Sequence, residues 1–135
     1  MSTEAENVRI LKDVYDCFNR GELEPAMNAV SDDVEYHSIG PAERIPWAGI
    51  HKGRDAFIGY MQTVASNLEH VEFVADEFIA QADKVAVLGH MKTRSLNTNR
   101  EGETEWVHWV TMRDGKIAKV KEFYDTCVAI ELHCD

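Results

Sequence analysis

The sequence feature that most constrains the fold is an Asp-Gly pair, Asp114-Gly115, between two segments with strand character. Residues 106–112 (WVHWVTM) precede it and residues 116–126 (KIAKVKEFYDT) follow it. Asp-Gly between two such runs is the strongest short-range signal for a β-hairpin. The second strand carries an acid, Asp125, beside aromatic residues, where a carboxylate is costly unless it is paired, hydrogen-bonded or hydrated. Asp125 is therefore the first candidate for a functional residue.

Helical patterns occupy the first half of the chain, and strand patterns occupy the second half. The expected helices cover about 8–18, 23–30 and 54–68, and the expected strands cover about 34–39, 70–81, 84–96, 103–113 and 116–126. Thr3 or Ser2 can cap the first helix. The loop at 40–53 is apolar enough to cover part of the core. The order predicts one α+β domain spanning residues 1–135, with three N-terminal helices packed on a curved, mostly antiparallel sheet.

Composition excludes several classes of protein. The formal net charge of −10 repels phosphate backbones, so we expect no nucleic-acid partner. No apolar run approaches the roughly 20 residues that cross a bilayer, and the acidic N-terminus is unlike a signal peptide, so we expect a cytoplasmic protein with no membrane partner. The three cysteines lack metal-type spacing, and no Gly-rich phosphate loop is present. We therefore expect neither a metal site nor a cofactor.

Five local motifs connect the chain to a known family. They are 32–37 (DDVEYH), 46–49 (PWAG), 51–56 (HKGRDA), 113–117 (RDGKI) and 122–126 (EFYDT). In order and content the chain resembles the superfamily named for nuclear transport factor 2, which includes the ketosteroid isomerases, and within it the SnoaL-like branch of polyketide cyclases. The resemblance implies a cystatin-like cone that encloses a deep, mostly apolar pocket, and a homodimer formed through the outer face of the sheet.

Two acids compete for the catalytic position. Asp125 matches the acid at the end of the last strand that serves as general acid or base in SnoaL-like cyclases. Pairing outward from a two-residue turn instead places Glu122 with Trp109 on the apolar face that we expect to line the pocket, and Asp125 with His108 on the other face. A β-bulge would be able to turn Asp125 into the pocket. Both acids therefore stay candidates.

Further candidates are polar or aromatic. His37 matches a position that often lines the SnoaL-like pocket, and Tyr15 is expected to assist as a catalytic hydroxyl. The expected ligand-binding residues are aromatic side chains, two methionines and a histidine: Phe18, Tyr36, Trp47, Phe57, Tyr60, Met61, Met91, His108, Trp109 and Tyr124. We treat His70 as structural or exposed.

The face that carries His108 is predicted to be the dimer interface. It also carries Lys119 and Lys121, and more apolar surface than a monomer normally leaves open. Its apolar members are Trp106, Val110, Met112, Ile117 and Phe123. His90 is expected almost opposite His108, and paired histidines move protons in dehydratases of the scytalone type. We interpret this face as exposed or as buried in a two-fold homodimer.

Two better-defined activities of the superfamily lack their residues here. Tyr36 occupies the position of the ketosteroid isomerase base, and residues 88–92 (LGHMK) lack the Arg-x-Asp of limonene-type epoxide hydrolases. The leading hypothesis is cofactor-free acid/base catalysis of the cyclase, isomerase or dehydratase type on a small hydrophobic carbonyl compound. The alternative is a non-catalytic module of the same fold for small-molecule binding or assembly.

Overall fold

The structure, a computed structural model, describes residues 3–134. The helices are α1 (Glu4–Asn19), α2 (Leu23–Met27), α3 (Arg54–Asn67) and α4 (Thr126–His133). The strands are β1 (Val30–Ser38), β2 (Gly49–Lys52), β3 (Leu68–Gln81), β4 (Lys84–Ser95), β5 (Glu101–Arg113) and β6 (Lys116–Tyr124). Across the described residues, no helix is both long and apolar enough to cross a membrane.

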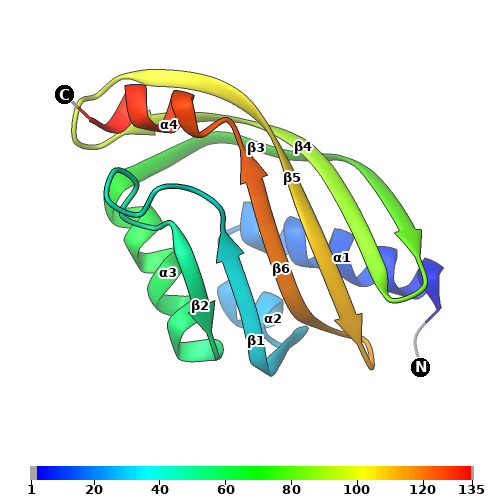
Figure 1. The fold of residues 1–135 in the computed structure, drawn as a ribbon. Coiled ribbons are helices and arrows are strands. Elements are labelled where there is room, and N and C mark those ends of the chain that lie inside the picture. Colours follow the sequence, from blue (N-terminus) through cyan, green and yellow to red (C-terminus); the bar gives the residue numbers. More distant parts are fainter. Residues whose placement is uncertain (1–2, 135) are drawn as a thin grey trace.

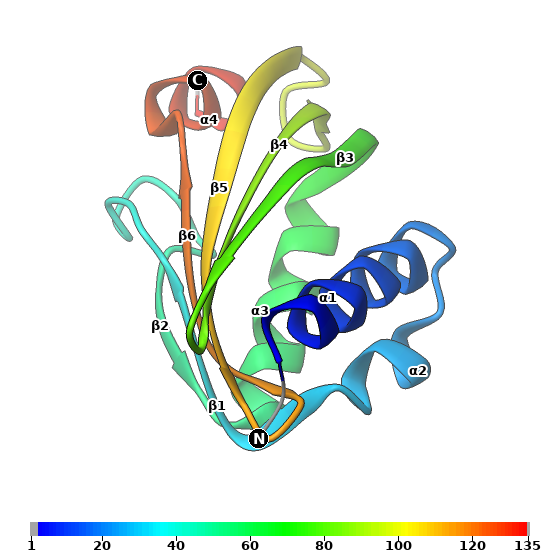
Figure 2. The same ribbon diagram turned by 90° about the vertical axis from the view of Figure 1, so that its right-hand side faces the viewer.

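The strands form a single curved sheet in the order β2-β1-β6-β5-β4-β3 (Figure 1). β1 and β6 run parallel, and the other neighbouring strands run antiparallel. Helices α1, α2 and α3 lie on the concave side of the sheet, and α4 lies at its far end (Figure 2). The predicted α+β architecture, with helices on a curved and mostly antiparallel sheet, is confirmed.

Helix α1 faces the sheet with one apolar stripe. Leu11, Val14 and Tyr15 are buried on this stripe, which follows the helical spacing of the sequence. The Thr3 hydroxyl accepts a hydrogen bond from the backbone N–H of Glu6 at 3.1 Å, so it caps the helix as expected. The other predicted cap, Ser2, lies outside the described residues. The stripe carries the Tyr15 hydroxyl toward the inner face of the sheet.

The hairpin between β5 and β6 has the expected turn followed by a bulge. Asp114 and Gly115 have φ values of 51° and 76°, as a two-residue turn with two left-handed positions requires. Met112 pairs with Ile117, but Thr111 pairs with Lys119, so Ala118 is an extra residue in β6. A bulge of this kind shifts the register of everything beyond it.

The bulge corrects the predicted faces of the hairpin. Beyond it, His108 lies directly opposite Glu122, so these two side chains share the inner face. Trp109, predicted to share that face with Glu122, is instead 42 % exposed on the outer side. His90 pairs with Glu105 in the register of β4 and β5, so the predicted pairing of His90 with His108 is also wrong.

The residues predicted for the dimer interface are corrected in the same way. Trp106, His108, Val110, Met112 and Ile117 are buried, because they point toward the helices. Phe123 belongs to the outer side, where it is 42 % exposed. A homodimer stays a prediction, and its surface would have to be the outer one that carries Phe123.

Three local boundaries also differ from the expectation. The second helix ends at Met27, because Val30 already pairs with Ile117 in the sheet. The loop at 40–53 contains strand β2, and its apolar residues Ile45 and Trp47 are buried as predicted. The C-terminal tail forms helix α4, which sequence periodicity did not reveal. Tertiary pairing overrides local propensity at such short elements.

Candidate functional site

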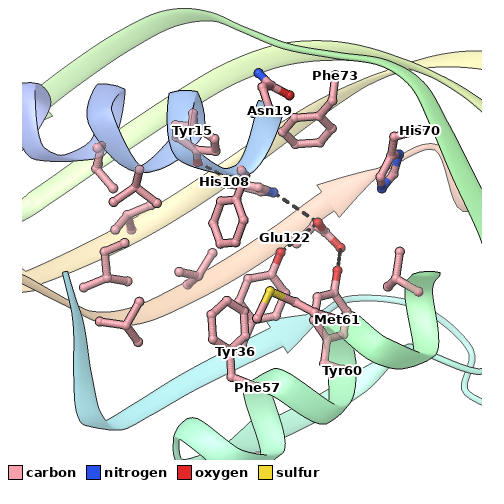
Figure 3. A pocket seen from close by; sticks show the side chains of 18 of the residues that line it. Tyr15, Asn19, Tyr36, Phe57, Tyr60, Met61, His70, Phe73, His108 and Glu122 are labelled. Carbon is pink, nitrogen blue, oxygen red and sulfur yellow. Dashed lines mark hydrogen bonds and ion pairs between the residues drawn. The ribbon is translucent and has the colours of Figure 1, made fainter. Parts of the chain in front are cut away.

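A cavity of about 530 Å³ lies between the concave face of the sheet and helices α1 and α3. Its wall is mostly apolar, and the close-up in Figure 3 shows its polar groups gathered around Glu122. The apolar lining comes from Leu11, Val14, Phe18, Val30, Val34, Phe57, Met61, Val64, Ala65, Leu68, Val71, Phe73, Val110, Ile117 and Val120. A cavity of this size and polarity is typical of a small-molecule site.

Glu122 is the polar centre of this cavity. One carboxylate oxygen, Oε1, accepts hydrogen bonds from Ser38 Oγ and Tyr60 OH, both at 3.0 Å. The other oxygen, Oε2, accepts from Tyr36 OH at 2.8 Å and contacts His108 Nε2 at 3.1 Å. A carboxylate offers about four acceptor sites. The four partners therefore saturate Glu122.

Four elements bring these partners together. The parallel pairing of β1 with β6 sets Ser38 beside Glu122, and Tyr36 precedes it by two residues on the same face of β1. The bulged hairpin sets His108 of β5 opposite Glu122. Helix α3 contributes Tyr60, which lies across the cavity from the sheet in Figure 3. The site thus depends on register as much as on residue type.

The carboxylate of Glu122 is ionised at neutral pH. Burial pushes its pKa upward, but the hydrogen bonds from His108, Tyr36 and Ser38 outweigh burial and hold the pKa below its ordinary value. An ionised carboxylate only accepts hydrogen bonds. The Nε2 atom of His108 therefore carries a hydrogen and donates a hydrogen bond to Glu122 Oε2.

The second nitrogen of His108 extends the chain of hydrogen bonds to α1. Its Nδ1 lies 2.7 Å from the hydroxyl of Tyr15. In the neutral ring, Nδ1 is the acceptor, so Tyr15 donates to it. Burial and the nearby Glu122 charge raise the pKa of Tyr15 far above its ordinary value, which keeps the hydroxyl protonated. We call the three residues Tyr15, His108 and Glu122 the relay.

Aromatic packing holds the relay histidine in place. The ring centroids of Trp106 and His108 are 4.3 Å apart, and Phe73 stacks on Trp106 at 4.6 Å. Gly89 makes room for this indole, because a Cβ there would clash with the Trp106 ring and with the carbonyl oxygen of Val74. A histidine packed against an indole and hydrogen-bonded at both nitrogens is well positioned for proton transfer.

The structure brings together only part of the predicted site. Tyr15, Phe18, Tyr36, Phe57, Tyr60, Met61, His108 and Glu122 all line the cavity. Trp47, Met91 and Tyr124 instead line an adjoining space of about 40 Å³ near α4, which shares Glu122 and Tyr60 with the main cavity. There Trp47 Nε1 donates to Tyr124 OH at 2.9 Å. They are neighbours of the site and not part of the main wall.

Three candidates point elsewhere. Asp125 is exposed and caps α4, where its carboxylate accepts hydrogen bonds from the backbone N–H groups of Cys127 at 3.0 Å and Val128 at 3.4 Å. His37 alternates with inward-facing neighbours on β1, so its side chain points to the outer side of the sheet. Trp109 is on that outer side as well.

Sequence reasoning missed several residues of the cavity. Ser38 was detectable, because it follows Tyr36 at the strand period of two. His70, treated as structural or exposed, is exposed and lines the cavity rim at the start of β3. Asn19 lines the rim at the end of α1, and no sequence signal marks it. Within residues 3–134, no three His, Cys, Asp or Glu side chains are grouped to hold a metal ion.

Comparisons with known proteins agree with this architecture. An NTF2-like protein from Burkholderia xenovorans is 30 % identical over 97 % of this chain and 98 % of its own, with a TM-score of 0.86. An NTF2-like protein of unknown function from Burkholderia pseudomallei is 24 % identical over the full length of both chains, with a TM-score of 0.89.

A third solved structure contains a small molecule. TerC, co-crystallized with polyporic acid, is 25 % identical over 96 % of this chain and 99 % of its own, with a TM-score of 0.87. Among curated proteins, no significant match was found. The family model of the SnoaL-like domain matches residues 11–120, which is most of the chain. The chain therefore belongs to the SnoaL-like family and has the NTF2-like fold.

Proposed function

We propose that this protein is a cofactor-free acid/base catalyst of the cyclase, isomerase or dehydratase type that acts on a small hydrophobic carbonyl compound. The observation that carries the proposal is the relay. Tyr15, His108 and Glu122 are joined by contacts of 2.7 Å and 3.1 Å inside an apolar cavity of about 530 Å³. A base oriented by a second group, which is itself oriented by a third, is the arrangement that activates a hydroxyl for chemistry.

The proton path follows from the hydrogen bonds. The Tyr15 oxygen takes a proton from the carbon next to the substrate carbonyl while its own proton passes to His108 Nδ1. The charge of Glu122 stabilises the imidazolium that forms. The reverse transfer returns a proton to another atom of the same intermediate, which completes an isomerisation or follows a ring closure. Positioned proton transfer of this kind contributes about 10²–10⁴-fold to a rate.

His70 is the group best suited to the carbonyl oxygen. It lines the rim of the same cavity, where the residue is partly open to solvent, and the burial of its ring lowers its pKa despite the opposing influence of Glu122. The ring is therefore neutral at pH 7 and has one N–H to donate. A donor aimed at the oxygen that becomes negative lowers the barrier to enolate formation.

Exchange of carbon-bound hydrogen tests this proposal without knowledge of the natural substrate. 2-Tetralone is a hydrophobic ketone with acidic hydrogens next to the carbonyl, and NMR in D₂O measures its deuterium uptake. We expect the protein to accelerate uptake and Tyr15→Phe to reduce the acceleration by about 10²-fold or more. Tyr124→Phe is the matched control, because it removes one hydroxyl that does not line the main cavity. Equal rates for the two variants would contradict the proposal.

A binding module is the second candidate, and one observation favours it. The four partners that saturate Glu122 leave its oxygens no free acceptor site for a substrate proton, as in a purely structural network. TerC, with its bound polyporic acid, supports a small-molecule ligand for this fold. Calorimetric binding of 2-tetralone with deuterium uptake at the uncatalysed rate would favour this candidate.

A further inference from the structure

The cavity contains no positively charged anchor. Among the described residues that line it, none is lysine or arginine, and the carboxylates are Glu122 at its centre and Glu72 at its edge. Proteins that bind carboxylates or phosphates place an arginine, a lysine or a cluster of free N–H groups at the ligand. The formal net charge of −10 adds to the unfavourable potential for an anion.

The two cavity histidines add no positive charge to compensate for this. His108 uses Nε2 on Glu122 and Nδ1 on Tyr15, so it has no N–H left for an incoming anion. Burial lowers the pKa of His70, so its neutral ring offers a ligand one N–H and no positive charge. The edge carboxylate of Glu72 is partly balanced by His90, 2.9 Å away, but the carboxylate of Glu122 faces a low-dielectric cavity in which charges interact strongly.

From this distribution of charge we infer that the cavity selects uncharged hydrophobic molecules and rejects organic carboxylates of the same shape. The inference rests on the proposed function, because it names the substrate class of the same site. It agrees with proton abstraction as well. The substrate proton moves to Tyr15 as the Tyr15 proton moves to His108, so the total charge in the cavity does not change when an enolate forms.

A matched pair of ligands tests the inference. 2-Acetylnaphthalene is neutral and 2-naphthoate is an anion of nearly the same size, and calorimetry at pH 7.5 gives both dissociation constants. We expect the neutral ketone to bind about tenfold or more tightly than the carboxylate. Equal or tighter binding of 2-naphthoate would overturn the inference, as would the absence of ketone binding at millimolar concentration.

Two lysine variants that change the net charge equally test whether the rejection of carboxylates comes from the cavity. Asn19→Lys adds one positive charge at the cavity rim, and Gln62→Lys adds one on α3 at a residue that does not line the cavity. Both positions are exposed, so both variants are expected to fold. Asn19→Lys should tighten 2-naphthoate binding about three- to tenfold, whereas Gln62→Lys should leave it unchanged. Equal effects would show that net charge, and not the cavity, decides selectivity.

The failure of this inference is distinguishable from the failure of the proposed function. Tight carboxylate binding together with Tyr15-dependent deuterium uptake into 2-tetralone would overturn the inference alone. Selective binding of the neutral ketone with no uptake would overturn the catalytic proposal alone.

Discussion

Glu122 and Asp125 are three residues apart at the end of the same strand, yet their environments are opposite. The side chain of Glu122 is 12 % exposed and holds four hydrogen-bonding partners from β1, β5 and α3. Asp125 is exposed and caps α4 through two backbone N–H groups. Carboxylates so close in sequence differ because one lies inside the strand ladder, where register decides its neighbours, and the other lies just beyond it.

The register of β6 beyond the bulge at Ala118 is the feature on which this difference depends most. Beyond the bulge, Lys121 pairs with Trp109 and Glu122 pairs with His108. Deletion of Lys121 would bring Glu122 opposite Trp109 on the outer side, or would turn Val120 out of the core if the strand re-paired without the bulge. We expect the free energy of unfolding in urea titration to fall by about 4 kcal/mol or more, or cooperative unfolding to be lost.

Deletion of Ala118 is the matched control for chain shortening. It removes the one residue of this segment that has no partner, so Lys119 still faces Thr111 and Glu122 still faces His108. Its effect on stability should therefore be far smaller than that of deleting Lys121. Equal losses for the two deletions would mean that register is not what positions Glu122.

Substitution of each acid by alanine should separate their structural roles. Glu122→Ala leaves four donors, on Ser38, Tyr36, Tyr60 and His108, without their acceptor. We expect it to lower the free energy of unfolding by about 3–5 kcal/mol. Asp125→Ala removes a helix cap and should cost about 1 kcal/mol. Urea unfolding followed by circular dichroism measures both. Similar losses of stability in the two variants would mean that the hydrogen bonds of Glu122 contribute little to the free energy of unfolding.

Acid should weaken the protein through Glu122. The folded-state pKa of Glu122 lies below its ordinary value of 4.5, so the folded state binds fewer protons than the unfolded state in that range. Its contribution is therefore complete above about pH 4.5 and is lost as pH falls through the folded pKa. We expect Glu122→Gln to flatten this part of the profile of stability against pH. A Glu122→Gln slope equal to that of wild type would contradict the assignment.

The contrast between inner and outer positions extends to neighbours on β5. Val110 is fully buried, so Val110→Glu should prevent folding. Trp109 is exposed on the outer side, so Trp109→Glu should change stability by only about 0.5 kcal/mol. The predicted homodimer would use this outer side as its interface. Trp109→Glu should then convert the dimer to a monomer of 15.3 kDa in sedimentation. A wild-type protein that already sediments at that mass would refute the dimer.

The sequence was sufficient for the fold and for part of the lining of the candidate cavity. Periodicity in 54–67 and the Asp114-Gly115 turn predicted α3 and the hairpin, because each signal is local and repeated. The faces of β5 and β6 were assigned wrongly, because regular pairing was assumed through Ala118, which the structure leaves without a partner. Helix α4 was missed because its start depends on the cap at Asp125, and a single aspartate fits many other roles.

The relay needed the structure for a further reason. Tyr15 and His108 are 93 residues apart, and no spacing rule relates a helix residue to a strand residue across a cavity. Ser38 and Tyr36 were accessible from strand alternation once Glu122 was known to face inward. The register between the strands was therefore the information that the sequence did not supply.

The measurement that tests the central claim most directly is deuterium uptake into 2-tetralone with Glu122→Gln and Asp125→Asn side by side. Each variant replaces one carboxylate by an amide of the same shape, and circular dichroism confirms that each is folded. The relay predicts that Glu122→Gln lowers the catalysed rate by about 10²-fold or more, because the imidazolium of His108 loses its counter-charge. Asp125→Asn should match wild type. A rate that falls with Asp125→Asn and persists with Glu122→Gln would contradict the account.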